Sequence, residues 1–451
     1  MHVTPTTKDM TPSSRPPHPR LPLFQRFFQT EAAGGGLLLL SACAALIAAN
    51  TSWADDYRRL WSIPVGISVM NYSLSLTLHE WINDGLMAIF FLLVGLEIKR
   101  EFIAGELSSP RQAALPLAGA LGGMVLPAVI YLLVNSTGVE ARGWGIPMAT
   151  DIAFALGVLS VIAPTIPLGA KVFLTALAIV DDMGAVLVIA VFYTHALDWT
   201  SVTFAAVMLA ALISLNATRV HRLAPYLLLG AALWWFVHAS GIHSTIAGVL
   251  LAFTIPTRTR INAADFSHEA RALLEDFDRT ETGDYAVLTS KGQQEAIYSL
   301  GRASEAVTAP LLRLEHALQD FSAFVVMPLF ALSNVGVSVA GSQLNWRVAL
   351  GIAVGLALGK PLGITVAASA AVALKLGTLP KRVNWVALHG CAWVGGIGFT
   401  MSLFIANLAF EGTALLDSAK LGILGGSLVG GVVAALVLRV GSTAKRAAAE
   451  E

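Results

Sequence analysis

Residues 171–192 read KVFLTALAIVDDMGAVLVIAVF, an apolar run with two adjacent aspartates, Asp181 and Asp182, near its centre. A helix needs about 20 apolar residues to cross a bilayer. A charged side chain at the centre of such a helix costs at least about 2.5–3.5 kcal/mol, which makes it a functional hypothesis by default. Consecutive helix positions point about 100° apart, so both carboxylates can border one cavity. The run predicts a membrane helix with an anionic site.

The composition of the whole chain supports a membrane protein. Its 451 residues are 55% hydrophobic and only 13% charged, and the mean hydropathy is +0.69. Soluble domains carry about 25% charged residues. The net charge is zero, which gives no indication of a nucleic-acid partner. Cys43 and Cys391 both lie in apolar runs and form no CxxC motif, so we interpret them as small packing residues.

About twelve apolar runs are candidates for transmembrane helices. Their centres lie near Ser41, Phe91, Gly123, Phe154, Ile179, Leu209, Ala231, Gly248, Pro328, Gly355, Gly398 and Val429. Loops rich in Lys and Arg alternate with loops that have few or none, as expected when the basic loops face the cytoplasm. We therefore predict an even number of spans, with both termini in the cytoplasm. The predicted organisation is a disordered tail at 1–30, a transmembrane domain at 31–438 and a cytoplasmic tail at 439–451.

Two segments depart from the apolar helical pattern. Residues 63–80 alternate apolar and polar positions on both sides of Asn71, which favours an extracytoplasmic β-hairpin over an irregular loop. An isolated hairpin is marginally stable, so we expect it to pair with a second subunit. The cytoplasmic segment 257–310 holds two amphipathic stretches, 266–277 and 293–307. These predict surface helices that form either a lid or a simple linker.

Further charges and glycines lie inside the apolar runs. Asp151 follows Thr150 and a Gly/Pro-rich approach, and Lys360 precedes Pro361 within another run. The run HGCAWVGGIGFTMSLF at 389–404 contains several glycines, Gly396 and Gly398 among them. Gly/Pro-interrupted helices in both halves of a chain are typical of transporter sites. We predict a helix cap or a site charge for Asp151, and an interfacial or buried cation for Lys360.

Several motifs in order resemble the NhaA family of bacterial Na⁺/H⁺ antiporters. They are INDGLMAIFFLLVGLEIKRE (82–101), ATDIAFALGVL (149–159), AIVDDMGAVLVIA (178–190), SGIHSTIAGV (240–249), RLEH (313–316), GKPLGI (359–364) and GGIGFTMSLFIANLAF (395–410). The resemblance spans about residues 31–436. It implies an all-α polytopic fold of twelve helices with inverted repeats, and two interrupted helices that cross near Asp151 and Gly396. It also implies location in the bacterial inner membrane.

The resemblance implies a role for particular residues of this chain. Asp181 and Asp182 match the family's ion-binding and proton-binding pair. Thr150, Asp151, Lys360, Gly396 and Gly398 match the charges and breaks around that pair. A cytoplasmic pH-response cluster matches Glu97, Arg100, Glu101, His243 and Glu315, and the hairpin at 63–80 matches a homodimer contact. The segment near 262–305 is longer than is usual in the family.

The implied activity is pH-regulated, electrogenic exchange of Na⁺ or Li⁺ for protons, with no cofactor and no enzymatic reaction. The chemistry agrees, because hard cations favour oxygen ligands and a carboxylate in hydrocarbon must be neutralised by a proton, a cation or a partner charge. We assign Asp151 to positive helix ends, and Lys360 either to negative helix ends or to a pair with Asp181. The alternatives are an exchanger for another monovalent cation or a cation channel. An intramembrane aspartyl protease needs aspartates on two helices and is disfavoured.

Overall fold

The computed structural model describes residues 23–69, 72–164, 166–194, 197–279, 290–338 and 344–450. Helices dominate, because a segment in hydrocarbon must satisfy its backbone N–H and C=O groups internally. The first half of the chain contains α1 (Leu23–Ala49), α2 (Ala54–Trp61), β1 (Pro64–Val69), β2 (Tyr72–Thr77), α3 (Leu78–Glu80), η1 (Trp81–Leu86), α4 (Met87–Ala104), η2 (Glu106–Ser108), α5 (Pro110–Val134), η3 (Glu140–Met148), α6 (Ile152–Ile162), α7 (Leu168–Phe192), α8 (Trp199–Ala217) and α9 (Leu223–Ala239).

The second half contains α10 (Ile246–Thr254), α11 (Ala263–Asp278), α13 (Lys291–Val307), α14 (Pro310–Phe321), η4 (Ser322–Val326), α15 (Met327–Asn334), α16 (Trp346–Val354), η5 (Gly355–Gly359), α17 (Lys360–Ala373), α18 (Trp385–Gly395), α19 (Phe399–Phe410) and α20 (Leu415–Glu450). Among the described residues, seven helices are long and apolar enough to cross a membrane, or up to ten if each bent pair counts as one span. The predicted polytopic helical class is confirmed. Each predicted span centre lies in a helix, except Gly398, which directly precedes α19.

The first and last helices run past the bounds predicted for the transmembrane domain, although their apolar spans, 33–49 and 415–440, lie close to those bounds. Helix α1 begins at Leu23, inside the segment predicted as a disordered tail, directly after Pro22. Proline is well suited to a helix start, and the apolar residues that follow continue the helix. Helix α20 continues through residue 450, past the predicted boundary at 439. The Ala, Lys and Arg residues there have high helix propensity, so nothing in the sequence ends the helix.

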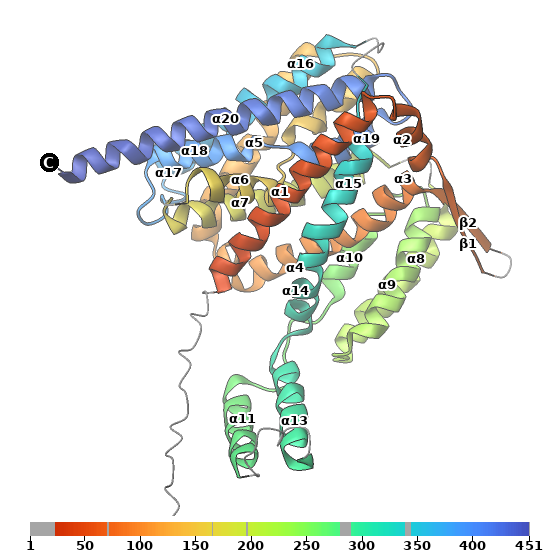
Figure 1. Ribbon diagram of the computed structural model, residues 1–451, viewed down its shortest axis with the longest axis vertical. Helices are drawn as coiled ribbons and strands as arrows, with labels where there is room; N and C mark the ends of the chain where they lie inside the picture. The colour runs from red at the N-terminus through yellow and green to blue at the C-terminus, as the bar shows by residue number, and fades with distance from the viewer. Residues whose placement is uncertain are drawn as a thin grey trace, which may run out of the picture.

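The predicted β-hairpin is confirmed as two antiparallel strands. Pro64 pairs with Thr77 and Val69 with Tyr72, while the predicted turn residue Asn71 lies outside the described residues. Thr77 caps the following helix through a capping box with Glu80, which ends the sheet at that residue. Figure 1 shows the hairpin projecting beside α8 and α9 at the edge of the helical body.

The two amphipathic stretches of the segment 257–310 are the helices α11 and α13. Asn262 and Ser290 cap their N-termini through backbone N–H groups three residues later. The two helices pack against each other and project beyond α14, away from the other helices (Figure 1). Side chains of α11 remain largely in contact with solvent, since none of its residues is buried.

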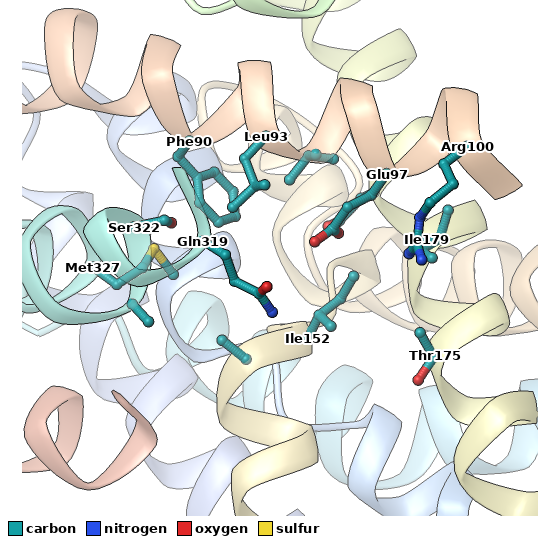
Figure 2. A pocket seen from close by; sticks show the side chains of 14 residues that line it. Phe90, Leu93, Glu97, Arg100, Ile152, Thr175, Ile179, Gln319, Ser322 and Met327 are labelled. Atoms are coloured by element: carbon teal, nitrogen blue, oxygen red, sulfur yellow. The ribbon is translucent and has the colours of Figure 1, made fainter. Parts of the chain in front are cut away.

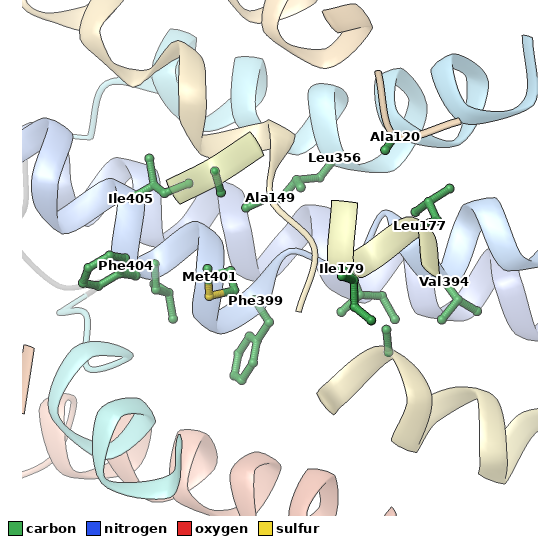
Figure 3. Close-up of a cluster of buried hydrophobic side chains, with 14 of the residues drawn as sticks. Ala120, Ala149, Leu177, Ile179, Leu356, Val394, Phe399, Met401, Phe404 and Ile405 are labelled. Carbon is green, nitrogen blue, oxygen red and sulfur yellow. The ribbon is translucent and has the colours of Figure 1, made fainter. Parts of the chain in front are cut away.

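The largest buried apolar cluster surrounds the interrupted helices. Figure 3 shows Leu177 and Ile179 of α7 near Val394 of α18, with Phe399 and Met401 of α19 on the far side of the break. The residues that carry the predicted site therefore lie within a large buried cluster, and side chains in such close-packed interiors have few alternative rotamers.

Helices α5 and α17 approach closely at paired glycines. A Cβ atom on Gly122 would collide with the Gly363 carbonyl, and one on Gly363 would collide with the Gly122 carbonyl. Small residues allow membrane helices to pack backbone against backbone. This contact lies one turn after Lys360, which begins α17 directly after the π-helical turn η5. The glycine contact thus positions the helix that carries the buried lysine.

We predict that Gly363→Ala lowers the melting temperature of the detergent-purified protein, because the added methyl group must separate two backbones. Overpacking of this kind costs about 1–3 kcal/mol. Gly425→Ala in α20 is the matched control, since a Cβ there meets no atom within 4 Å. The control should leave the melting temperature unchanged or slightly higher. Equal thermal shifts in the two variants would show that the contact is not close.

Candidate ion site

The two interrupted helices cross at their breaks. Helices η3 and α6 are bent by 47° relative to each other, at a break formed by residues 149–151. Helices α18 and α19 are bent by 41° at a break formed by residues 396–398. The Asp151 N–H donates to the Ile397 carbonyl over 2.9 Å, which joins the two unwound stretches. The Ser402 hydroxyl donates to the Ile146 carbonyl over 2.8 Å. The breaks therefore leave helix ends facing one another in the protein interior.

Asp151 lies where two helix N-termini meet. Its Oδ1 accepts from the Phe154 N–H at 3.0 Å in α6, and its Oδ2 accepts from the Thr400 N–H at 3.1 Å in α19. The Thr400 hydroxyl also donates to this Oδ2. Helix N-termini carry partial positive charge, which favours a carboxylate there. The geometry agrees with the predicted assignment of Asp151 to positive helix ends.

Lys360 is fully buried between Asp181 and a helix C-terminus. Its ammonium donates to the Asp181 Oδ2 and to the carbonyl of Met148, the last residue of η3. The Thr150 hydroxyl lies 2.5 Å from the same Asp181 oxygen and 2.9 Å from the Gly395 carbonyl. The two arrangements that sequence analysis left open for Lys360 thus exist together, since one ammonium contacts both partners.

Asp182 has a different environment from its neighbour. Both residues are 1% exposed, yet neither Asp182 carboxylate oxygen has a hydrogen-bond partner, and the Asp181 Oδ1 also lacks one. Buried carboxylate oxygens almost always accept hydrogen bonds, so three open oxygens in adjacent residues need an explanation. Their chemistry fits a hard monovalent cation, which binds oxygen ligands and brings a compensating charge.

Asp182 borders a small cavity of about 60 Å³ between α4, α6, α7 and α14. Figure 2 shows Glu97 of α4 and Gln319 of α14 pointing into this space, with Arg100 at one side. Most of its lining is apolar, but a cavity of this size has room for water beside the polar side chains of Glu97, Gln319 and Asp182. We call it the inner cavity, and it lies between Asp182 and the end of α4 that carries Glu97.

Four of the five predicted pH-response residues gather at this end of α4. Arg100 forms ion pairs with Glu315 at 3.3 Å and with Glu101 at 3.4 Å, and Glu97 lines the inner cavity beside Arg100. The Glu315 side chain is only 8% exposed, so this cluster differs from charged side chains that merely lie in water at the membrane surface.

The expected place of His243 was wrong. His243 lies in a second cavity, of about 370 Å³, together with Asp84, and not with Glu97. Asp84 and Glu97 are separated by roughly 20 Å along the same helical span, given the rise per residue. The loop charges already indicated this, because residues 240–243 lie in a loop without Lys or Arg. A motif match alone does not specify the side of the membrane.

This second cavity, the outer cavity, is lined by His79, Asn83 and Asn407, polar residues that sequence analysis did not select, and the buried Asn334 links them. Asn334 donates to Asn83 Oδ1 at 2.9 Å, Asn407 donates to Asn334 Oδ1 at 2.7 Å, and a ring nitrogen of His79 lies 3.0 Å from that oxygen. Asparagine within apolar runs was the available signal. Thr400 and Gln319 were also missed, because their importance depends on long-range contacts.

An aromatic layer separates the outer cavity from the carboxylates. The Phe404 ring lies 5.3 Å from that of Phe91 and 6.2 Å from that of Phe330, measured between centroids. Phe404 also borders the outer cavity, and it follows Thr400 by one turn of α19. The structure is therefore apolar and well packed between Asp151 and the outer cavity.

Comparison with known proteins agrees with this architecture. The profile of the family described as Na⁺/H⁺ antiporter 1 matches residues 25–438. The chain is 48% identical over 420 residues to the Na(+)/H(+) antiporter NhaA of Oleidesulfovibrio alaskensis, covering 92% of this chain and 93% of that protein. It is also 48% identical to the NhaA of Koribacter versatilis, with 92% and 90% covered.

The NhaA of Helicobacter pylori is 44% identical over 421 residues, with 92% of this chain and 95% of that protein covered. Similarity of this extent includes the interrupted helices, the paired aspartates and the buried lysine within a single matched region. The helical membrane architecture, the crossing breaks and these matches together show that the chain belongs to the Na⁺/H⁺ antiporter 1 family.

Proposed function

We propose that this protein exchanges Na⁺ or Li⁺ for protons across the bacterial inner membrane, with Asp181 and Asp182 as the shared binding site. The observation that carries this assignment is the open coordination of Asp182, which lines the inner cavity and whose two buried oxygens accept no hydrogen bond within the described part of the chain. The family membership supports Na⁺ and H⁺ as the two ions exchanged, since the relatives are named Na⁺/H⁺ antiporters.

Exchange follows from competition for one anionic site. A carboxylate at bilayer depth requires a proton, a cation or a partner charge. Lys360 supplies the partner charge for Asp181, and Asp182 is left to bind a proton or a sodium ion. A sodium ion at Asp182 also attracts the open Oδ1 of Asp181 and competes with the ammonium. The Met148 carbonyl then retains Lys360 nearby.

The membrane topology belongs to the same proposal. We infer twelve spans, in which the bent pairs and the short helices α9 and α10 each count as crossings, with inverted repeats and both termini in the cytoplasm. The alternation of basic loops and the two crossing breaks support this arrangement. The inner cavity then opens toward the cytoplasm, where Glu97, Arg100, Glu101 and Glu315 regulate exchange through coupled titration.

A cation channel or an exchanger for another monovalent cation is the alternative. A channel needs a continuous polar path, whereas Phe91, Phe330 and Phe404 are buried and packed ring against ring next to the outer cavity. This apolar packing favours an exchanger. Selectivity between Na⁺ and another monovalent cation depends on ligand geometry around the bound ion, and it is tested directly by binding measurements.

We predict that Asp182→Asn abolishes exchange in proteoliposomes under an imposed pH gradient, and that Asp181→Asn does nearly the same. Asparagine keeps the size of the side chain but cannot alternate between a proton and a cation. Asp182→Asn should fold normally, because it removes a desolvated charge that accepts no hydrogen bond. Asp181→Asn leaves the Lys360 ammonium without its carboxylate and should be less stable, so its exchange is compared at equal amounts of folded protein. Asp56→Asn, an exposed change in α2, is the matched control.

Calorimetry supplies the decisive measurement for these variants. Wild-type Na⁺ binding should weaken as the pH falls, because protonated carboxylates no longer attract the ion, and should release protons in unbuffered solution. Sodium binding and exchange by Asp182→Asn at the wild-type level would refute the assignment.

We predict that Lys360→Ala lowers both exchange and thermal stability, whereas Lys360→Arg is milder. Removal of one partner of a buried ion pair costs about 3–5 kcal/mol when the remaining charge stays uncompensated. The double variant Lys360→Ala/Asp181→Asn should recover part of the lost melting temperature, because no orphan charge remains. Additive thermal losses in the double variant would argue against a compensating pair.

We predict that deletion of residues 65–76 weakens a homodimer formed through the β-hairpin, while exchange by the monomer persists. The two strands leave both sheet edges unpaired, and Ile63 and Val65 are exposed. The measurement is the dimer fraction in detergent by native mass spectrometry. Val65→Lys is a less disruptive companion that should act in the same direction. A dimer fraction that does not change in either variant would exclude the hairpin contact.

A further inference from the structure

A third cavity, which no step of the proposed exchange uses, lies at the predicted cytoplasmic edge of the helices. It has a volume of about 650 Å³ and lies between the N-termini of α5 and α7 and the loop that follows α17. Three cationic side chains line it: Arg111, Lys381 and Arg382. Cavities of several hundred Å³ accommodate small ligands or the headgroup of a lipid.

The charges of this basic cavity are not compensated within the described part of the chain. No ion pair involves Arg111, Lys381 or Arg382 in those residues, and Glu106 is the carboxylate among the lining side chains. The lining thus has an excess of positive charge. Arginine binds phosphate oxygens through two parallel N–H groups, and lysine binds them as a point charge.

Two helix N-termini add partial positive charge to this cavity. Helices α5 and α7 begin at Pro110 and Leu168, and neither N-terminus has a side-chain hydrogen-bond cap. Uncapped N–H groups and the helix dipole both favour an anion. A Cβ on Gly169 would lie 3.0 Å from Pro380 and 3.1 Å from the Lys381 carbonyl, so the loop packs directly on the first turn of α7.

The rim of the cavity indicates where the anion comes from. Leu168, which lines the cavity, is 59% exposed, and Leu374 and Leu376, just before the lining loop, are 70% and 60% exposed. An exposed leucine in the lining of a basic opening, with two more shortly before the lining loop in sequence, is suited to contact with acyl chains. Basic pockets at the cytoplasmic ends of membrane helices are suited to anionic headgroups.

We propose that this basic cavity binds the phosphodiester headgroup of an anionic phospholipid of the inner leaflet. Arg111, Lys381 and Arg382 bind the phosphate, and Leu168 contacts the acyl chains. The bound headgroup would bridge α7, which carries Asp181 and Asp182, and the loop between α17 and α18. It would therefore hold together elements that carry the ion site.

The test is native mass spectrometry of the full chain in detergent, titrated with phosphatidylglycerol or with zwitterionic phosphatidylcholine. The triple variant Arg111→Gln/Lys381→Gln/Arg382→Gln should bind phosphatidylglycerol roughly ten- to a hundredfold more weakly than wild type. Phosphatidylcholine binding should not change. The matched control is Arg222→Gln/Arg258→Gln/Arg260→Gln, which removes the same charge from exposed residues outside the cavity.

A further variant, expected to change the affinity in the opposite direction, distinguishes loss of the binding site from misfolding. Glu106→Gln removes the carboxylate from the lining and should tighten phosphatidylglycerol binding a few fold, a result that damage to the fold would not give. Wild-type affinity in the triple variant, or equal weakening in the control, would overturn the proposal. A competing arm with inorganic phosphate decides the source of the anion. Complete displacement of phosphatidylglycerol by millimolar phosphate would overturn the lipid assignment in favour of a soluble phosphate.

Discussion

The buried ammonium of Lys360 is the interaction on which the rest of the structure depends. Its partners are a carboxylate oxygen of Asp181 and the carbonyl of Met148, so one cation neutralises a side chain and a helix end at once. Such a group is stable in hydrocarbon only when its geometry is held firmly. The π-helical turn before Lys360 and the glycine contact between α5 and α17 provide that support.

Adjacent residues can carry opposite tasks when their surroundings differ. Asp181 is held by Lys360 and Thr150, while Asp182 lines the inner cavity and accepts no hydrogen bond from the described residues. One helical step of about 100° produces this difference. In the proposed exchange, a fixed charge pair beside an open carboxylate is the single anionic site for which proton and sodium compete. Adjacent positions thus give the two carboxylates different surroundings, which two aspartates on the same helix face would not have.

Much of this arrangement could be predicted from the sequence. The apolar runs, the hairpin alternation and the paired aspartates have local signals, and the structure has helices, strands and a buried site there. The partners of Asp151 and Lys360 could not be predicted in the same way, because Thr400 and Met148 are distant in sequence. The sequence analysis also did not predict that α20 continues as a helix beyond its apolar run, because residues of high helix propensity follow there. His243 was misplaced because a motif carries no information on membrane side.

The aromatic layer of Phe91, Phe330 and Phe404 has an electrical consequence. Water in a cavity holds the potential of the compartment that fills it, so wherever both cavities are wet the membrane voltage falls across this layer alone. The hydrocarbon core is about 30 Å thick, and concentrating the same voltage in a thinner septum makes the local field steeper. Each elementary charge that crosses the septum gains or loses about 2.3 kcal/mol per 100 mV. A small displacement of the carboxylates relative to the layer could then convert nearly the whole membrane potential into work on the transported ion.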